Sequence, residues 1–254
     1  MTQLNDNHLL AALPQNILNR LLPELKLIDM PLGKVIYEPG VQLQHIYFPV
    51  TGCIVSMLYV MQNGSAAEIA VVGNEGMVGI ALFMGGDTTP SRALVQSGGQ
   101  AYQLSGAALM REFENHTELQ HLLLRFTQAL ITQMSQTAVC NRHHTVEQQL
   151  CRWLLLSLDR LADNRLTMTQ ELIANMLGVR REGVTEAAGR LQTRGLIQYS
   201  RGRITILDRA GLEAQVCECY AVVKKEYDRL LPPDPVVLQQ LWLQEKALPQ
   251  NLEY

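Results

Sequence analysis

The side chains with the clearest chemical potential lie between Thr169 and Arg194, in the stretch TQELIANMLGVRREGVTEAAGRLQTR. Hydrogen-bonding and charged groups recur there at helical spacing: Arg180, Arg181, Glu182, Thr185, Glu186 and Arg190. Arginine can donate two hydrogen bonds to guanine and glutamate can accept one from cytosine, so a helix that exposes both can read base edges in a major groove. The alternative is the solvated face of an ordinary amphipathic helix.

The flanking residues predict how this face is positioned. Thr169 can cap a first helix whose inward positions are Leu172, Ile173, Met176 and Leu177. Gly178 permits the positive φ that ends a helix in a tight turn. A second helix then begins at Arg181 and directs four apolar residues inward: Val184, Ala187, Ala188 and Leu191. The pattern predicts a helix-turn-helix.

The next stretch, GLIQYSRGRITIL, predicts a β-hairpin with a Ser-Arg-Gly turn. Such a hairpin would form a wing beside the second helix, with Arg201 at its tip and Arg203 on its flank. A guanidinium next to a glycine suits a phosphate contact, because the backbone can approach closely.

Charge is distributed unevenly along the chain. The net charge is −3, but residues 142–210 carry eleven cations against seven anions, a balance of +4. All eleven cations are arginine, the residue best suited to bidentate contacts with phosphate and guanine. The positive charge therefore coincides with the predicted helix-turn-helix and wing, which favours double-stranded DNA as a partner.

A length of 254 residues exceeds most single cores and predicts two domains with connecting pieces, and 47% hydrophobic content is ordinary for a globular protein. The strand and helix patterns along the chain predict an α+β fold. The predicted divisions are a β-barrel sensor domain (1–115), a dimerisation helix with hinge (116–141), a winged domain (142–231) and a tail (232–254). No apolar run reaches the roughly 18 residues of a membrane span, and the N-terminus shows no secretory signal. We therefore expect a cytoplasmic protein without membrane contact.

Short strand-like runs follow a helical N-terminus that Pro14 interrupts. They extend from Leu25 to Leu104 and predict an antiparallel jelly roll. Within it, Asn63-Gly64 predicts a two-residue hairpin, because both residues tolerate the left-handed conformation.

A long helix is predicted after residue 115. Two apolar stripes suggest two partners, the chain's own barrel and a second subunit, and a homodimer is favoured over burial within one protomer. The residues expected at the dimer helix are Leu119, Leu123, Phe126 and Leu130, with Gln133 and Gln136 in or beside the seam. We place the hinge at residues 141–145 and expect a helix over 146–161 with Trp153 in the core. A single helix is expected over 207–231, and a short one at 236–246 in the tail.

The order of these parts, and above all LTMTQELIANMLGVRREGVTEAAGRLQTRGLI, resembles the Crp/Fnr family of bacterial transcription regulators over about residues 20–210. The resemblance implies a cyclic-nucleotide-binding-like jelly roll, a homodimer, a winged helix-turn-helix and contact with RNA polymerase. It also implies base contacts by Arg181 and Glu182 and a phosphate contact by Thr169. Glu186 stands where cyclic-AMP-responsive members carry arginine, so a different DNA sequence is expected.

The candidate effector pocket departs further from that pattern, at Gly79, Ile80, Ser91 and Arg92. Ile80 cannot accept a hydrogen bond from a ribose hydroxyl, and Arg92 is one position out of register, which on a strand would turn it away from the pocket. The sequence therefore predicts control by an unidentified signal other than cyclic AMP. We predict no cofactor.

Metal sites and catalysis are not predicted. An Fnr-type iron–sulfur cluster needs several thiolates near the N-terminus, where Cys53 stands alone in the first 139 residues. Cys217 and Cys219 would diverge on a helix, so buried thiols are expected, and His143-His144 is expected to be solvated linker. His45, His116 and His121 are interpreted as surface or hydrogen-bonded residues rather than haem ligands. No enzyme motif is found, and the alternative function is a ligand-binding signalling module whose C-terminal helices contact proteins.

Overall fold

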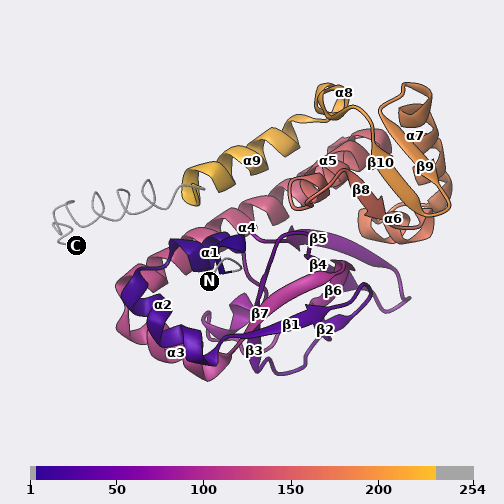
Figure 1. The fold of residues 1–254 in the computed structure, drawn as a ribbon. Coiled ribbons are helices and arrows are strands. Elements are labelled where there is room, and N and C mark those ends of the chain that lie inside the picture. The colour runs from indigo at the N-terminus through magenta and orange to yellow at the C-terminus, as the bar shows by residue number, and fades with distance from the viewer. Residues whose placement is uncertain (1–3, 233–254) are drawn as a thin grey trace, which may run out of the picture.

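The computed structural model describes residues 4–232. A β-sandwich with helices at one end is joined by the long helix α4 (Thr117–His143) to a smaller winged domain (Figure 1). The tail helix predicted at 236–246 lies outside the described residues. Within the described part of the chain, no helix combines the length and apolar character needed to cross a membrane.

Two antiparallel sheets form the sandwich. One has the strand order β1-β7-β3, with β1 (Lys26–Met30), β7 (Gly99–Ser105) and β3 (His45–Pro49). The other has the order β2-β6-β4-β5, with β2 (Val35–Tyr37), β6 (Arg92–Ser97), β4 (Ile54–Val60) and β5 (Ala66–Val72). Burial alternates along most of β3 and β6, because successive side chains of a strand point to opposite faces and every second one enters the core. These sheets confirm the predicted jelly-roll class.

The β4–β5 hairpin has a longer loop than predicted. Its strands pair as far as Val60 and Ala66, and the Gly64 amide donates to the Met61 carbonyl at 2.9 Å. Gly64 has a φ of 83°, whereas Asn63 keeps a negative φ and accepts a hydrogen bond from the Ser65 amide. The prediction of a two-residue turn was therefore wrong, and Asn63 stabilises the loop through its side chain instead.

Short helices close the end of the sandwich. They are η1 (Leu4–Asp6), α1 (His8–Ala12), α2 (Gln15–Leu21), η2 (Leu22–Glu24), η3 (Ile80–Leu82) and α3 (Gly106–Asn115). The break between α1 and α2 falls at Pro14, as predicted. Phe126 of α4 packs so closely on Gly76 that a Cβ there would lie 2.2 Å from the ring. Gly76 thus allows the long helix to reach the core.

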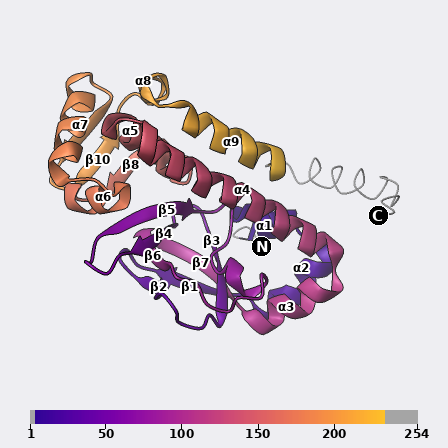
Figure 2. The same ribbon diagram turned by 180° about the vertical axis from the view of Figure 1, so that it is seen from behind.

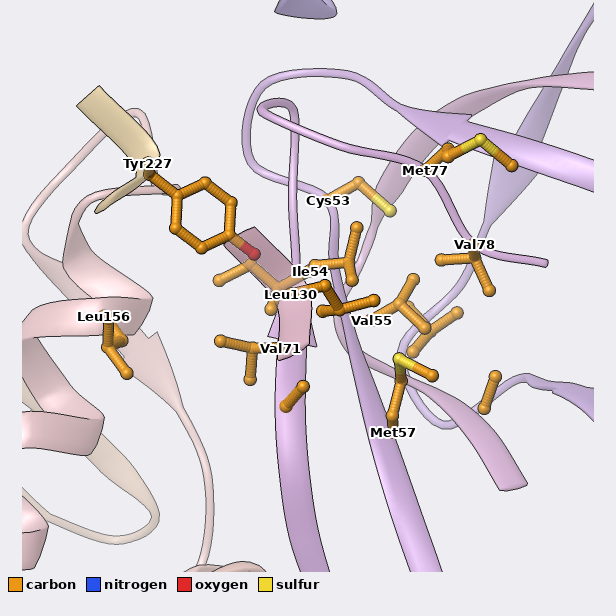
Figure 3. Packing of buried hydrophobic residues seen from close by; sticks show 14 of the residues in the cluster. Cys53, Ile54, Val55, Met57, Val71, Met77, Val78, Leu130, Leu156 and Tyr227 are labelled. Carbon is orange, nitrogen blue, oxygen red and sulfur yellow. The ribbon is translucent and has the colours of Figure 1, made fainter. Parts of the chain in front are cut away.

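The Gln133 side chain of α4 binds the sandwich through a set of hydrogen bonds that we call the Gln133 clip. The Gln133 side chain accepts from the Val71 amide at 2.7 Å and donates to the Val71 carbonyl at 3.1 Å and to the Tyr227 hydroxyl at 3.0 Å. Because β5 is an edge strand, Gln133 satisfies backbone groups that no further strand pairs. Figure 3 shows Tyr227 pointing toward Leu130 within the same apolar core.

The four residues predicted for the dimer helix are instead buried within the protomer: Leu119, Leu123, Phe126 and Leu130 are at most 2% exposed. They pack in one core cluster with the sandwich and α9 (Glu218–Leu230). In both ribbon views α9 runs beside α4 (Figure 2). The predicted double apolar face exists, but both of its partners come from the same chain.

The C-terminal helix is interrupted. α8 (Arg209–Gln215) ends before Val216, and Cys217 is the extended N-cap residue of α9, with φ −73° and ψ 164°. The prediction of a single helix over 207–231 was therefore wrong. The break also overturns the expected divergence of Cys217 and Cys219, whose sulfur atoms lie close together beside Cys140 and His144. His144 is a partly buried residue rather than solvated linker.

Candidate nucleic-acid interface

The helix-turn-helix forms as predicted from its local signals. α6 (Gln170–Leu177) begins at Thr169, whose hydroxyl accepts from the Leu172 amide at 3.2 Å. It ends at Gly178, which adopts φ 65° and the left-handed C-cap conformation. Leu172 is 42% exposed and does not join the inward face, contrary to the prediction.

The second helix, α7 (Arg181–Thr193), buries the four predicted apolar residues Val184, Ala187, Ala188 and Leu191. The opposite side, which we call the outer face, comprises Arg180, Arg181, Glu182, Thr185 and Glu186 and is largely exposed. The Thr185 hydroxyl donates to the Gln170 side chain at 2.8 Å and so links α7 to the start of α6. This hydrogen bond helps to hold the outer face in position relative to α6.

Arg190 lies apart from the outer face. Its Nε is 2.5 Å from Glu147 of α5 (Val146–Leu158), and Arg194 reaches the same carboxylate at 2.5 Å. Burial acts to raise the pKa of Glu147, but the two arginines outweigh burial and hold that pKa below its usual value. Arg190 thus joins α7 to α5, and Glu186 lies 3.9 Å from it.

The wing is a three-stranded sheet of order β8-β10-β9: β8 (Arg165–Thr167), β10 (Arg203–Ile206) and β9 (Ile197–Ser200). Its tip is a two-residue turn in which Arg201 and Gly202 have φ values of 51° and 75°. Glycine accepts this conformation readily, whereas arginine does so at a cost of about 1–2 kcal/mol. Strand β8 was not predicted, because it is only three residues long and ends just before the cap of α6.

One groove gathers residues from three elements. It is lined by Thr169 and Gln170 at the start of α6, Arg181 of α7, and Tyr199 and Arg201 of the wing. The Tyr199 hydroxyl donates to the Met168 carbonyl at 2.8 Å, and burial raises the pKa of Tyr199 to about 12. Arg203 lies beside Arg201 on the neighbouring side of the wing. The structure therefore brings Thr169, Arg181 and Arg201 together.

The winged domain also contacts the sandwich. A Cβ placed on Gly178 would lie 3.3 Å from the Cβ of Ala67 on β5, so the turn of the helix-turn-helix rests on the edge of the sheet. Arg160, which follows α5, is 6% exposed and its guanidinium lies 2.7 Å from the Glu75 carboxylate. Its aliphatic carbons occupy the space beside Gly73. We call this contact, with Glu68 and Gln133 nearby, the domain junction.

The β-sandwich domain contains an apolar cavity between the sheet and α4, lined by residues that include Tyr37, Met57, Ile69, Ile80, Ser91 and Met134. Among the described residues that line it, none carries a charge. Burial raises the pKa of Tyr37 to about 12, with the Ser91 hydroxyl acting in the opposite sense. Of the four predicted pocket residues, Ile80 and Ser91 line the cavity.

Gly79 and Arg92 do not line that cavity. Gly79 has a φ of 110° and starts η3, which positions Ile80. The Arg92 Nε donates to the Glu38 carboxylate at 2.8 Å, on a partly exposed surface. The geometry therefore supplies an apolar cavity with hydroxyl groups rather than an anion site.

Two of the three histidines considered as haem ligands, His45 and His116, lie in other environments. His116 lies 3.0 Å from the Glu112 carboxylate at the start of α4. The His45 ring lies 6.5 Å from the Tyr47 ring on β3. Neither lines the cavity, whose described lining includes no histidine.

Two family models match the chain: the cyclic nucleotide-binding domain over residues 28–116 and the Crp-like helix-turn-helix domain over residues 148–215. No curated protein matches the sequence. Many solved structures share the fold. A Crp/Fnr-family regulator from Eubacterium rectale is 17% identical with a TM-score of 0.65, covering 82% of this chain and 96% of its own.

Two further structures show the same fold at low identity. A CRP-family transcriptional regulator from Thermus thermophilus is 19% identical with a TM-score of 0.62, covering 74% of this chain and 95% of its own. The c-di-GMP-responsive regulator CLP from Xanthomonas campestris is 17% identical with a TM-score of 0.58, covering 76% and 99%. With a cyclic nucleotide-binding domain followed by a Crp-like DNA-binding helix-turn-helix in one chain, this protein belongs to the Crp/Fnr family of transcription regulators.

Proposed function

We propose that the protein is a homodimeric, sequence-specific DNA-binding regulator whose outer face on α7 reads base edges. The observation that carries this proposal is the groove in which Thr169, Arg181 and Arg201 meet beside an exposed polar helix face. A helix of this kind fits a major groove, and wing and cap residues on either side fit the flanking phosphates. Arg181 and Glu182 would then contact bases, and Thr169, Arg201 and Arg203 phosphates.

A second exposed stripe on α4 supports the homodimer. Leu124, Ile131 and Ala138 are exposed at seven-residue intervals, and the exposed positions between them are Gln128 and Ser135. Apolar residues repeated every seven positions form the seam of a two-stranded coiled coil. Pairing through this seam would place two α7 helices on successive major grooves, about 34 Å apart.

The dimer is tested by Ile131→Glu, because a carboxylate in the centre of the seam would be desolvated next to its symmetry mate. We expect wild type to sediment as a dimer and the variant as a folded monomer. Thr132→Glu, a neighbouring position outside the seam, is the matched control. A monomeric wild type, or a variant that still sediments as a dimer, would contradict this seam.

The apolar cavity supports control by a signal other than cyclic AMP. Its described lining holds no cation that could neutralise a phosphate, and Arg92 is engaged by Glu38. We expect isothermal calorimetry to detect no micromolar binding of cyclic AMP. CLP, which shares this fold, responds to c-di-GMP, so an effector other than cyclic AMP is compatible with the architecture.

The reading role of α7 is tested on a duplex selected from random sequences by the protein itself. Arg181→Ala should weaken binding by about 1–3 kcal/mol and relax preference at one base position. Arg190→Ala is the matched control, since it removes the same charge from the same helix at a side chain that contacts Glu147. If the two variants lose the same amount of DNA affinity, the effect of Arg181 is purely electrostatic. If the wild-type protein binds no DNA sequence selectively at low salt, a protein-binding module is favoured instead.

A further inference from the structure

We propose that Cys140, His144, Cys217 and Cys219 form a four-ligand zinc site that joins the hinge between α4 and α5 to the start of α9. The four ligand atoms lie within 4.8 Å of one another. Three thiolates and one imidazole are a donor set typical of closed, structural zinc sites. The site is separate from the DNA-binding surface and from the sensor cavity.

The distances within the cluster match a tetrahedron around zinc. The sulfur atoms of Cys140 and Cys217 are 3.6 Å apart, and Cys219 Sγ is 3.6 Å from His144 Nδ1. Zinc bonds of about 2.3 Å to sulfur and about 2.0 Å to nitrogen give tetrahedral edges of about 3.7 Å between two sulfurs and about 3.5 Å between sulfur and nitrogen. The observed separations therefore leave the space that one such ion would fill.

Local structure explains how the ligands converge. Cys140 and His144 are four residues apart at the C-terminal end of α4, so they lie on the same side of that helix. Cys217 is the N-cap of α9 and Cys219 lies in its first turn, and the extended backbone at Cys217 brings the two sulfurs to the same site. The three cysteines are at most 4% exposed and form a small buried cluster of their own, outside the main core.

A carboxylate supports the histidine. His144 turns Nδ1 toward Cys219, and its Nε2 lies 3.4 Å from the Glu218 carboxylate. Histidine ligands in proteins commonly donate the second ring N–H to such a group, which orients the ring and strengthens the ligand. Cys217 and Glu218 also line a surface groove, which provides a path for the ion to enter.

The site would make α9 part of the hinge. The chain between α4 and α5 consists of His144 and Thr145, the latter holding a capping box at the start of α5. An ion held by both His144 and α9 would fix the connection between the sensor and winged domains. The consequence for DNA binding rests on the proposed function, whereas the metal site itself does not.

The test uses reduced, metal-stripped full-length protein titrated with Co²⁺ and then with Zn²⁺. We expect one Co²⁺ per chain, with thiolate charge-transfer absorption and the strong visible bands of tetrahedral cobalt, displaced by one equivalent of Zn²⁺. Cys217→Ser and Cys140→Ser should abolish these bands. Cys53→Ser and Cys151→Ser are matched controls, since both are buried cysteines outside the cluster, and should retain the bands.

Two further measurements keep the proposal falsifiable if a cysteine variant fails to fold. Glu218→Gln, at an exposed position, should lower Zn²⁺ affinity about 10- to 100-fold. Zn²⁺ should also slow hydrogen exchange at the first turn of α9 in the wild-type protein. Failure to bind stoichiometric Co²⁺ or Zn²⁺, binding unchanged in Cys217→Ser, or hydrogen exchange at the first turn of α9 that Zn²⁺ leaves unchanged would overturn the site. None of these readouts involves DNA, so they are independent of the proposed regulator function.

Discussion

Arginine has opposite surroundings in two regions of this protein. On the outer face and the wing, Arg181 and Arg201 are exposed and stand beside other polar groups of a groove. At the domain junction, Arg160 is 6% exposed and bound to Glu75. An exposed arginine contributes little to folding and is available to a ligand, whereas a buried one is tied to its partner. The same residue type therefore suits recognition in one region and assembly in the other.

The largest effect is expected at the junction. Arg160→Met leaves the Glu75 carboxylate without its partner in a site where Glu75 is 16% exposed, and should lower the free energy of unfolding by about 3–5 kcal/mol. Urea unfolding of the full chain measures this. The double variant Arg160→Met/Glu75→Gln should recover much of the loss, and a single variant as stable as wild type would remove the contrast between the two regions.

A pH effect at the same junction comes next. Burial raises the pKa of Glu68 to about 7, against the opposing effects of Ser56, Arg152, Arg160 and Trp153. The folded state then holds a proton that the unfolded state releases near the ordinary value of 4.5, so stability is full at low pH and falls as pH rises through about 7. Over this pH range the free energy of unfolding should fall by about 3 kcal/mol in total.

Glu68→Gln removes this titration and provides the measurement. Unfolding free energies at about pH 5 and about pH 8 should differ less in Glu68→Gln than in wild type, because the variant has no carboxyl group to titrate there. Glu186→Gln, an exposed carboxylate on the outer face, should leave the wild-type difference unchanged. If both variants behave alike, the titration does not arise at the junction.

The smallest effect on stability, and of opposite sign, is expected at the wing tip. Arg201→Gly relieves a left-handed φ and should raise the unfolding free energy by up to about 1 kcal/mol. The same change should weaken DNA binding at every sequence and reduce the salt dependence of binding by about one phosphate contact. Thermal melting and fluorescence anisotropy at several salt concentrations measure the two effects, and a variant that binds DNA as tightly as wild type would show that Arg201 is not a phosphate contact.

The outer face could be predicted from the sequence because its determinants are local. Thr169, Gly178 and the inward apolar residues of α7 act within a single short stretch, and each behaved as its type and spacing required. The exposed position of Leu172 was missed because it depends on how α6 lies against the rest of the domain. The contact between Arg190 and Glu147 was also missed, because the two residues are 43 positions apart in the sequence.

The junction and the cysteine cluster depend on contacts that no local pattern encodes. Cys140 and Cys217 are 77 residues apart, and the expected helix over 207–231 concealed the bend that brings the second pair of ligands inward. The Cys-x-x-x-His and Cys-x-Cys spacings were the available signal. Likewise, the apolar stripes of α4 were recognised, but assigning their partners required knowing where α9 packs.

The Gln133 clip restricts how α4 can move. One side chain bonds both backbone groups of Val71 and the hydroxyl of Tyr227, next to Met134 in the wall of the cavity. A slide of α4 by a single residue, about 1.5 Å, would break all three bonds together. A molecule that displaced Met134 from the cavity wall would therefore have to move α4 against all three of these hydrogen bonds at once.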